Sequence, residues 1–349
     1  MVQRTSVARR TFSTPVILSL ILLAFALLAL AVGSKPFNQT IIDIFLRVIL
    51  VVGLYVFVGN SGVISFGHIG FTCLGAYAAA WLTIPPMMKE MSLPGLPGWL
   101  MQLQMPYWGA AGIAAVFAAV IALIFGRILM RLSGIAASIA TFAMMAMINT
   151  VYSNWESVTA ATSSVVGIPI VRTIWPYLIG AVLAVFVAWA HAISRAGLAL
   201  RAARDEPTAA AASGVDIPRE RLIAFTLSGA IMGLGGALFA HSIGVVTPDT
   251  FYLGLTFTTL SMLVVGGMGS LSGAVLGVVI LSSLIQGLRW LEKGVQIGAS
   301  TVSIPNGLQE IALGVVMIVI LIYRPAGIMG NLELSWPRTR TRKPDQGGS

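Results

Sequence analysis

Long apolar runs separated by short polar stretches extend over most of the chain. Each run is near the ~20 residues that a helix needs to cross the hydrocarbon core of a bilayer. Ten such runs can be placed, at 15–33, 38–58, 61–83, 108–130, 133–151, 173–193, 222–243, 251–267, 271–291 and 307–323. The pattern predicts an all-α, polytopic membrane protein with about ten transmembrane helices.

Two regions are rich enough in glycine for their helices to be broken or re-entrant. One is the run 61–83, and the other is the junction between the runs 251–267 and 271–291. At this density, glycine either lets helices approach closely or permits unwound backbone inside a protein. The positions that we expect in helix packing or a hinge are Gly67, Gly266, Gly267, Gly269 and Gly273.

Composition narrows the class of protein. Hydrophobic residues make up 57% of the 349 residues and charged residues 9%, whereas a soluble domain has about 25% charged residues. The net charge of +9 comes from basic residues at the ends of spans and in the tails. No aromatic residues are interleaved with them, so a nucleic-acid partner is excluded and contact with anionic lipid is favoured. The single cysteine, Cys73, excludes an intrachain disulfide and a cysteine-rich metal site.

The basic residues also predict the orientation of the chain. They fall into four clusters: Arg4, Arg9 and Arg10; Arg127 and Arg131; Arg195, Arg201, Arg204, Arg219 and Arg221; and Arg338, Arg340, Arg342 and Lys343. With an even number of spans, all four clusters lie on one side, which the positive-inside rule makes the cytoplasm. We expect a cytoplasmic tail at 1–14, a transmembrane domain at 15–330 and a second cytoplasmic tail at 331–349.

The most informative polar stretch is the loop 194–221, the longest charged segment between spans. Its many alanines favour a short helix, a turn and a second helix that begins at Pro207 and ends at Gly214. Asp205 and Glu206 would lie at the start of that second helix, where acidic residues are favoured. The small side chains would leave a face on which another protein can dock. The alternative is a solvated loop held by its charges.

Polar side chains at membrane depth are the candidates for a translocation path. They are Asn60, Ser61, Ser65 and His68, all in the first glycine-rich region. Such groups are costly in lipid unless they face protein or water. His68 is either a hydrogen-bonded structural residue or part of a proton relay, but a relay needs an acidic partner and the same span contains none.

Asp43 and Arg47 are the two charged residues inside the second span. Their i, i+4 spacing places both on one face of a helix. Three interpretations are open: a structural ion pair, an arginine that extends towards the membrane surface, or a contact to the substrate.

Four stretches of the sequence resemble the M-type permease subunit of the branched-chain amino acid importer family. They are GNSGVISFGHIGFTCLGAY (59–77), RAGLALRAARDEPTAAAASGV (195–215), TFYLGLTFTTLSMLVVGGMGSLSGAVLG (250–277) and YRPAGIMG (323–330). The segment from Glu206 to Gly214 resembles the EAA-type coupling loop of ATP-binding-cassette importers. Because the stretches extend from 59 to 330, the resemblance covers nearly all of the chain.

The resemblance implies a permease subunit in a bacterial inner membrane that carries branched-chain or similar hydrophobic amino acids. Its implied partners are a second permease in a heterodimer, two cytoplasmic ATP-binding subunits and a periplasmic substrate-binding protein. The residues implied in coupling to the ATPase are Arg204, Asp205, Glu206, Ala209, Ala210 and Gly214. The chain has no G-x-x-x-x-G-K-[ST] phosphate loop, so it would hold no cofactor itself and the partner subunits would bind ATP.

Other functions remain as alternatives. An importer of the same family could carry urea, short amides or other amino acids, because the soluble binding protein supplies much of the selectivity. A secondary transporter working without ATP would show more ionisable residues in its spans than this chain does. A membrane-embedded enzyme would need an H-E-x-x-H motif or paired carboxylates within a span, and the sequence has neither. We therefore expect a transporter and no enzyme.

Overall fold

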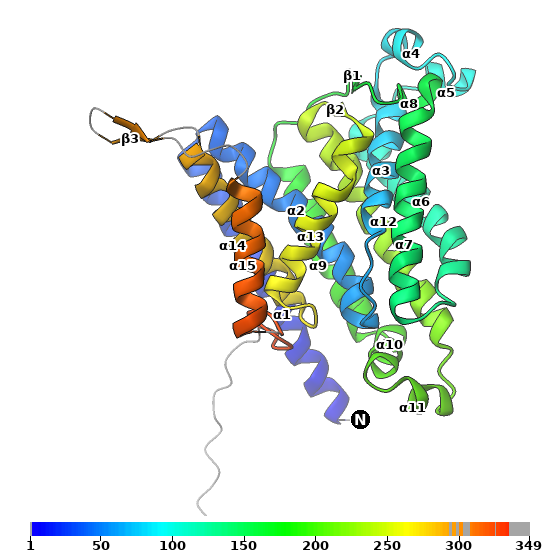
Figure 1. Cartoon of the computed structure of the whole chain (residues 1–349), viewed down its shortest axis with the longest axis vertical. Helices are drawn as coiled ribbons and strands as arrows, with labels where there is room; N and C mark the ends of the chain where they lie inside the picture. The colour runs from blue at the N-terminus through cyan, green and yellow to red at the C-terminus, as the bar shows by residue number, and fades with distance from the viewer. Residues whose placement is uncertain (1, 293–294, 298–299, 303–307, 325, 335–349) are drawn as a thin grey trace, which may run out of the picture.

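The structure is a computed structural model that describes residues 2–292, 295–297, 300–302, 308–324 and 326–334. The molecule is a bundle of long helices (Figure 1). Each predicted apolar run contains a long α-helix, which confirms the all-α class. The ten helices are α1 (Val2–Val32), α2 (Lys35–Ser61), α3 (His68–Thr83), α6 (Tyr107–Leu129), α7 (Gly134–Asn154), α9 (Trp175–Ile193), α12 (Ile217–Ile243), α13 (Leu253–Gly266), α14 (Leu271–Glu292) and α15 (Leu308–Tyr323).

Within the part of the chain that the structure describes, eight helices are long and apolar enough to cross a bilayer. The helices α3 and α15 have 16 residues each. Such a helix rises about 24 Å, which is less than the ~30 Å hydrocarbon core. In α3 the shortening has a local cause, because residues 62–67 of the predicted run 61–83 are not helical.

Short elements connect these helices. They are α4 (Pro86–Ser92), α5 (Gly98–Gln102), α8 (Glu156–Thr159), β1 (Val165–Val166), α10 (Arg195–Asp205), α11 (Pro207–Ala212), β2 (Val245–Val246), the 3-10 helix η1 (Pro248–Phe251), β3 (Val295–Ile297) and β4 (Ser300–Val302). The strands β1 and β2 pair antiparallel, with Val165 opposite Val246, and so do β3 and β4, with Val295 opposite Val302.

The two ends of the bundle differ in what they carry. The start of α1 and the helices α10 and α11 lie at one end, whereas α4, α5, β1 and β2 lie at the other (Figure 1). The first and third predicted basic clusters are therefore at the same end. The fourth cluster, at 338–343, lies outside the described residues. Below, the end with α10 is called the basal end, and the end with α4 is called the distal end.

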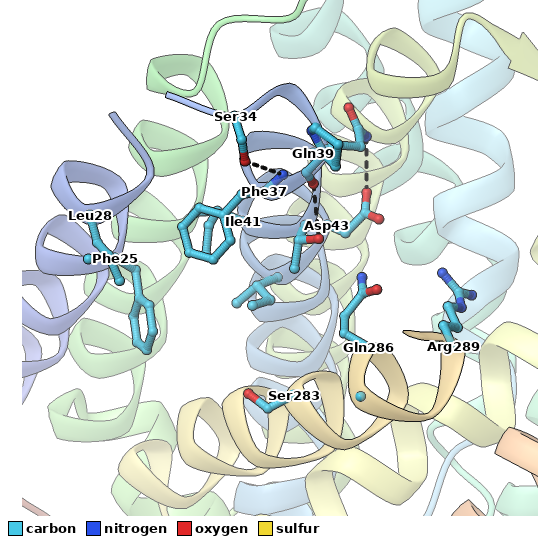
Figure 2. A pocket seen from close by; sticks show the side chains of 14 residues that line it. Phe25, Leu28, Ser34, Phe37, Gln39, Ile41, Asp43, Ser283, Gln286 and Arg289 are labelled. Carbon is cyan, nitrogen blue, oxygen red and sulfur yellow. Dashed lines mark hydrogen bonds between the residues drawn. The ribbon is translucent and has the colours of Figure 1, made fainter. Parts of the chain in front are cut away.

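Near the distal end, α1, α2 and α14 surround an open pocket (Figure 2).

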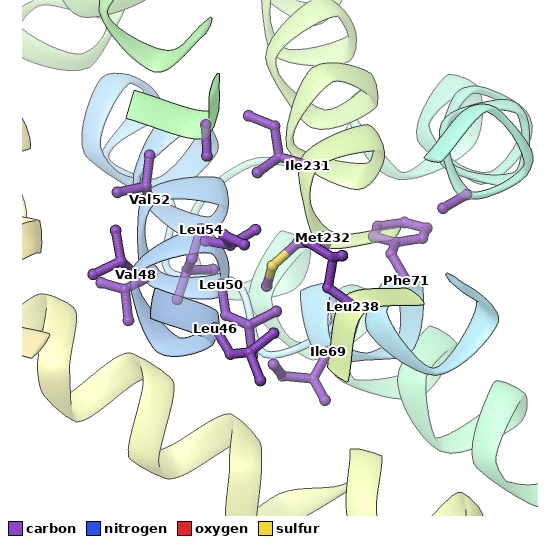
Figure 3. Packing of buried hydrophobic residues seen from close by; sticks show 14 of the residues in the cluster. Leu46, Val48, Leu50, Val52, Leu54, Ile69, Phe71, Ile231, Met232 and Leu238 are labelled. Atoms are coloured by element: carbon purple, nitrogen blue, oxygen red, sulfur yellow. The ribbon is translucent and has the colours of Figure 1, made fainter. Parts of the chain in front are cut away.

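Towards the basal end, helix α2 lies at the centre of the bundle. Every residue from Val48 to Ser61 is buried. A helix that is apolar on all sides is expected in the interior rather than at a surface. Leu46 and Leu50 of α2 and Met232 and Leu238 of α12 are among the buried residues of the packed core (Figure 3).

The contact between α3 and α12 depends on glycine. A Cβ atom added at Gly236 would lie 2.0 Å from the carbonyl oxygen of Thr72, and one added at Gly75 would lie 2.1 Å from the carbonyl oxygen of Gly233. Neither distance leaves room for a methyl group. The absence of side chains lets the two backbones approach closely, as is common where helices pack inside a membrane.

The loop at 84–107 is a folded distal cap built around Lys89. Its side chain is fully buried, and Nζ donates hydrogen bonds to the carbonyl oxygens of Leu100 at 2.9 Å and Leu103 at 2.5 Å. Burial lowers the pKa of Lys89, since removal from water disfavours the charged amine. The bonds tie α4 to α5 and the segment after it.

Candidate functional site

The chain unwinds between α2 and α3. At Gly62 the backbone takes a left-handed conformation with φ +70°, and its N–H donates to the carbonyl oxygen of Val58 at 2.9 Å. Glycine adopts this conformation without strain. Helix α7 supports the unwound segment, because Ser138 Oγ donates to the carbonyl oxygen of Ile64 at 2.6 Å. At Gly67, a Cβ would lie 2.2 Å from the carbonyl oxygen of Thr141, so α7 lies directly against this first break.

The four predicted translocation residues lie in or beside the first break, and all are buried. Asn60 Nδ2 donates to the carbonyl oxygen of Val56 at 2.9 Å, and Ser61 Oγ accepts from the N–H of Val63 at 3.2 Å. Ser65 Oγ lies 2.7 Å from His68 Nδ1. Their role in translocation stays a prediction.

Aromatic rings surround His68. Its ring centroid lies 5.2 Å from that of Phe57 and 5.1 Å from that of Phe225. A buried imidazole held by a serine and enclosed by phenylalanines is the arrangement expected of a structural histidine. No carboxylate is among the contacts recorded for His68 in the described chain, and a proton relay would need one.

A second break separates α13 from α14. The predicted pair of runs is interrupted at 267–270, where Gly267 has φ +120°. The two helices are in contact immediately beyond the break, since a Cβ at Gly266 would lie 2.0 Å from the carbonyl oxygen of Gly273. Gly269 instead faces the side chain of Asn331.

Residues 326–334, here called the C-terminal strap, lie along this second break. The N–H groups of Ile328 and Met329 donate to the carbonyl oxygens of Val265 and Gly266 at 2.9 and 3.0 Å. These carbonyls belong to the last turn of α13, where intrahelical partners are missing. The strap includes the first residues of the segment interpreted from the sequence as a tail.

Glu333 of the strap caps the start of α14. Its carboxylate accepts hydrogen bonds from the N–H of Leu271 at 2.6 Å, the N–H of Ser272 at 3.0 Å and Ser272 Oγ at 2.6 Å. An anion is favoured at a helix N-terminus, where N–H groups lack intrahelical partners. Sequence reasoning missed this residue, because the cap comes from about sixty positions further along the chain.

The loop 194–221 forms the predicted helix, turn and helix. Helix α10 ends at Asp205, α11 begins at Pro207, and Gly214 follows with φ +84°. Most of the residues implied in coupling are exposed, namely Asp205, Glu206, Ala209 and Gly214. Ala210 is buried against the rest of the chain and is not on the exposed face.

Arg204 connects α10 to the first break. A guanidinium nitrogen donates to the carbonyl oxygen of Gly59 at 2.7 Å, and the group pairs with Asp205 at 3.1 Å. The aliphatic part of Arg204 lies over Gly62, where a Cβ would come within 2.5 Å of Cγ. Arg204 therefore contacts Gly59 and Gly62, which flank Asn60 and Ser61 of the predicted path.

The two breaks meet beside Arg204. A Cβ at Gly59 would lie 2.6 Å from the carbonyl oxygen of Met268. A pocket of about 210 Å³ is lined by Val58, Gly59, Gly62, Arg204, Val264, Met268, Gly269, Ala326 and Asn331. The first break, the second break and the coupling helix α10, which are far apart in the sequence, thus meet at one site at the basal end.

Asp43 and Arg47 occupy a different place, in the distal half of α2. Among the described residues, Arg204 and Asp205 form a salt bridge, whereas Asp43 and Arg47 do not. Asp43 Oδ1 instead accepts a hydrogen bond from Gln39 at 3.2 Å. Arg47 and Arg289 of α14 both act electrostatically on the Asp43 carboxylate.

A bundle of membrane-length helices with two touching backbone breaks and an exposed helical hairpin beside them has the features of a polytopic transport protein. Residues 37–321 match the family described as branched-chain amino acid transport system, permease component. The chain belongs to this family, which confirms both the permease assignment and the expectation of a transporter rather than an enzyme.

Curated relatives agree with this family. The chain is 27% identical over 344 residues to the high-affinity branched-chain amino acid transport system permease protein LivM of Escherichia coli (strain K12), covering 87% of this chain and 73% of the relative. It is 22% identical over 309 residues to LivH of the same strain, covering 82% and 92%. A shorter match, 28% over 144 residues, is to the autoinducer 2 import system permease protein LsrC of Escherichia coli O9:H4 (strain HS), covering 41% and 40%. No solved structure matches the chain significantly.

Proposed function

We propose that this permease carries branched-chain amino acids across a bacterial inner membrane, driven by ATP that two separate cytoplasmic subunits bind and hydrolyse. It pairs with a second, related permease, and a periplasmic binding protein delivers the substrate to its distal end. The basal end and both termini face the cytoplasm. The chain itself holds no cofactor.

The observation that carries the proposal is the contact between Arg204 and Gly59. The exposed hairpin α10–α11 is the docking face for an ATPase. Because Arg204 hydrogen-bonds the last turn of α2 and lies beside Met268, a displacement of α10 reaches both breaks directly. Movement at the breaks then opens the path between the two permeases alternately to each side. Similarity to proteins named LivM and LivH supports both the substrate and the paired arrangement.

The substitution Glu206→Lys tests the coupling face. Glu206 is exposed at the start of α11, and reversing its charge should weaken ATPase docking while leaving insertion intact. We expect leucine uptake and co-purified ATPase to fall by about tenfold, as for a contact worth about 1.4 kcal/mol. Ser133→Lys, at an exposed residue of the α6–α7 turn, is the control. Normal uptake by Glu206→Lys would contradict the assignment of α10–α11 as the coupling site.

The substrate is tested by uptake of radiolabelled leucine into cells with and without this chain, with the other transport components present. Loss of uptake in the deletion strain, together with competition by isoleucine and valine in the parent, is the expected result. Uptake that stays unchanged in a strain lacking other leucine importers would contradict the branched-chain substrate and direct the search to urea, amides or other amino acids.

A further inference from the structure

The C-terminal strap binds both helices that meet at the second break. Its first part, 326–329, is called the anchored part, and two backbone hydrogen bonds hold it to the last turn of α13. Its next part, 331–333, is called the capping part and is held to α14. Here Ser270 Oγ, just before α14, donates to the carbonyl oxygen of Leu332 at 2.6 Å, and Glu333 accepts the three hydrogen bonds of its cap. The strap therefore bridges α13 and α14.

Gly330 separates the two parts of the strap. Its φ is +57°, in the left-handed region that glycine enters without strain. The anchored part is packed into the break, since a Cβ at Gly327 would lie 2.6 Å from Cα of Gly267. The capping part is exposed at the basal end, from Asn331 to Glu333. Exposed hydrogen bonds and few buried apolar groups mark segments that open locally, so the capping part is the half that can release.

The contact between α13 and α14 beyond the break offers little resistance to relative movement. Gly266 of α13 faces Gly273 and Gly277 of α14, and a Cβ at Gly277 would lie 2.9 Å from Cα of Gly266. Larger side chains pack ridges into grooves and fix the position of one helix on another, whereas glycines have no side chains to interlock. At this contact, the hydrogen bonds of the strap hold the start of α14 in place.

Movement of α14 would change the spaces inside the permease. Ser283 and Gln286 of α14 line the open distal pocket of about 1040 Å³, whose other walls belong to α1 and α2. A tilt of α14 would widen or narrow this pocket. At the basal end, the pocket of about 210 Å³ has Asn331 and Arg204 among its lining residues. The capping part therefore borders an unfilled space next to the hairpin that is proposed to dock the ATPase.

We propose that the capping part is a latch that releases and rebinds α14 in each transport cycle. Glu333 is the positioning residue of this latch, because its carboxylate holds the first turn of α14. Thr14 Oγ1 of α1 donates to the carbonyl oxygen of Leu334 at 2.9 Å, so the strap stays attached beyond the latch when Glu333 releases α14, and Gly330 is its hinge. The proposal rests on the proposed function and deepens it by naming the element that controls the second break.

A disulfide bond that holds the latch closed provides the first test. A Cβ at Gly269 would lie 3.1 Å from Cγ of Asn331, and Cγ is one bond from Cβ. Cysteines at these two positions can therefore reach the ~3.5–4.5 Å between Cβ atoms that a disulfide requires. The variant Gly269→Cys/Asn331→Cys is made in a Cys73→Ala chain, which removes the buried native thiol. It is assembled with its partner subunits in proteoliposomes.

We expect oxidation to lower ATP-driven leucine uptake by this variant at least about tenfold, because a blocked gating movement limits turnover. Reduction with dithiothreitol should restore uptake. The Cys73→Ala chain, treated in the same way, controls for cysteines of the partner subunits, and mass spectrometry measures the fraction that is cross-linked. A fully cross-linked variant that transports as fast as its own reduced form would overturn the latch. Failure of the disulfide to form would also overturn it, because the closed latch brings the two cysteines together.

Substitution of Glu333 provides a second test that needs no new cysteine. Glu333→Ala releases α14 without a transport signal, so ATP hydrolysis in the absence of the binding protein should rise about threefold or more, within the range for loss of a helix cap. Leucine carried per ATP should fall, and Glu333→Gln, which keeps one acceptor oxygen, should be intermediate. Glu90→Ala, at an exposed carboxylate of the distal cap, is the control for hydrolysis. A purely structural role would leave the ratio of leucine to ATP unchanged, and that result would contradict the latch.

Uptake by the unmodified importer separates the latch from the function on which it rests. If the unmodified importer takes up no substrate, the proposed function fails and the latch fails with it. If it takes up urea or an amide instead of leucine, the branched-chain substrate is wrong, and the cross-linking comparison made with that substrate still decides the latch. If leucine uptake is normal and insensitive to the cross-link, the latch alone is wrong.

Discussion

Removing the carboxylate of Glu333 should loosen the C-terminal strap from α14. The substitution Glu333→Ala deletes three hydrogen bonds, two of them from N–H groups in the first turn of the helix. Loss of a side-chain cap costs about 0.5–2 kcal/mol. A carboxylate acceptor raises the value of each bond, but Glu333 is exposed at the basal end, where water can replace part of the loss. We therefore expect a destabilisation of about 1–2 kcal/mol.

The assay is thermal unfolding of the purified chain in detergent, followed by tryptophan fluorescence. A loss of this size should lower the melting temperature by about 2–4 °C, because a large chain shifts about 2 °C for each kcal/mol. The control is Glu90→Ala, which removes an exposed carboxylate of α4 that caps neither α13 nor α14. It should leave the melting temperature unchanged.

A double-mutant cycle identifies the contact responsible. Ser272 both donates to Glu333 and accepts from the N–H of Leu334 at 3.0 Å. Ser272→Ala and Glu333→Ala should therefore be non-additive, with an interaction energy of about 0.5 kcal/mol or more. The reasoning is refuted if Glu333→Ala melts like the unmodified chain, or if the two effects simply add.

Two further substitutions test the packing of the fold. Gly236→Ala places a methyl group against the carbonyl oxygen of Thr72, so α3 and α12 must separate, at a cost of about 1–3 kcal/mol. Thermal unfolding should show this loss of stability. The control Gly112→Ala, whose methyl group meets nothing within 4 Å, should be neutral. Lys89→Met leaves two carbonyl oxygens of the distal cap without their donor, so limited proteolysis at 93–105 should become faster. Because burial lowers the pKa of Lys89, the unfolded chain binds more protons than the folded chain at pH values between that lowered pKa and 10.5. The distal cap should therefore resist proteolysis better as the pH rises through this window. Lys89→Met should remove this pH dependence. A cap that responds to pH identically in both proteins would contradict this assignment.

The sequence predicted the helices well because bilayer length and hydropathy determine them. Each of the ten apolar runs contains a long helix, and the glycine-rich stretches mark both breaks. The hairpin α10–α11 was predicted from Pro207 and Gly214, whose backbone preferences act locally. Helices, helix breaks and the hairpin depend on residues close together in the sequence, so they can be predicted from each segment separately.

What the sequence did not reveal depends on contacts between distant segments. Nothing near Glu333 indicates a helix start at Leu271, and the i, i+4 spacing of Asp43 and Arg47 does not reveal that Arg289 of the distant helix α14 lines the same pocket as the acid. Similarly, alanine composition did not distinguish the exposed Ala209 from the buried Ala210. These differences follow from tertiary packing, which spacing along one helix does not specify.

The central position of α2 has a consequence for biosynthesis. The helices α9, α12 and α14, which pack around it, are all encoded after it. The start of α12 follows the end of α2 by 156 residues (217 − 61), which takes about 8–30 s to translate at 5–20 residues per second. During this interval Asp43 and Arg47 lack their final neighbours on α12, α13 and α14. Chains truncated before α12 should therefore be retained by insertion and quality-control factors, and α2 becomes stable in the bilayer only after translation has passed α12.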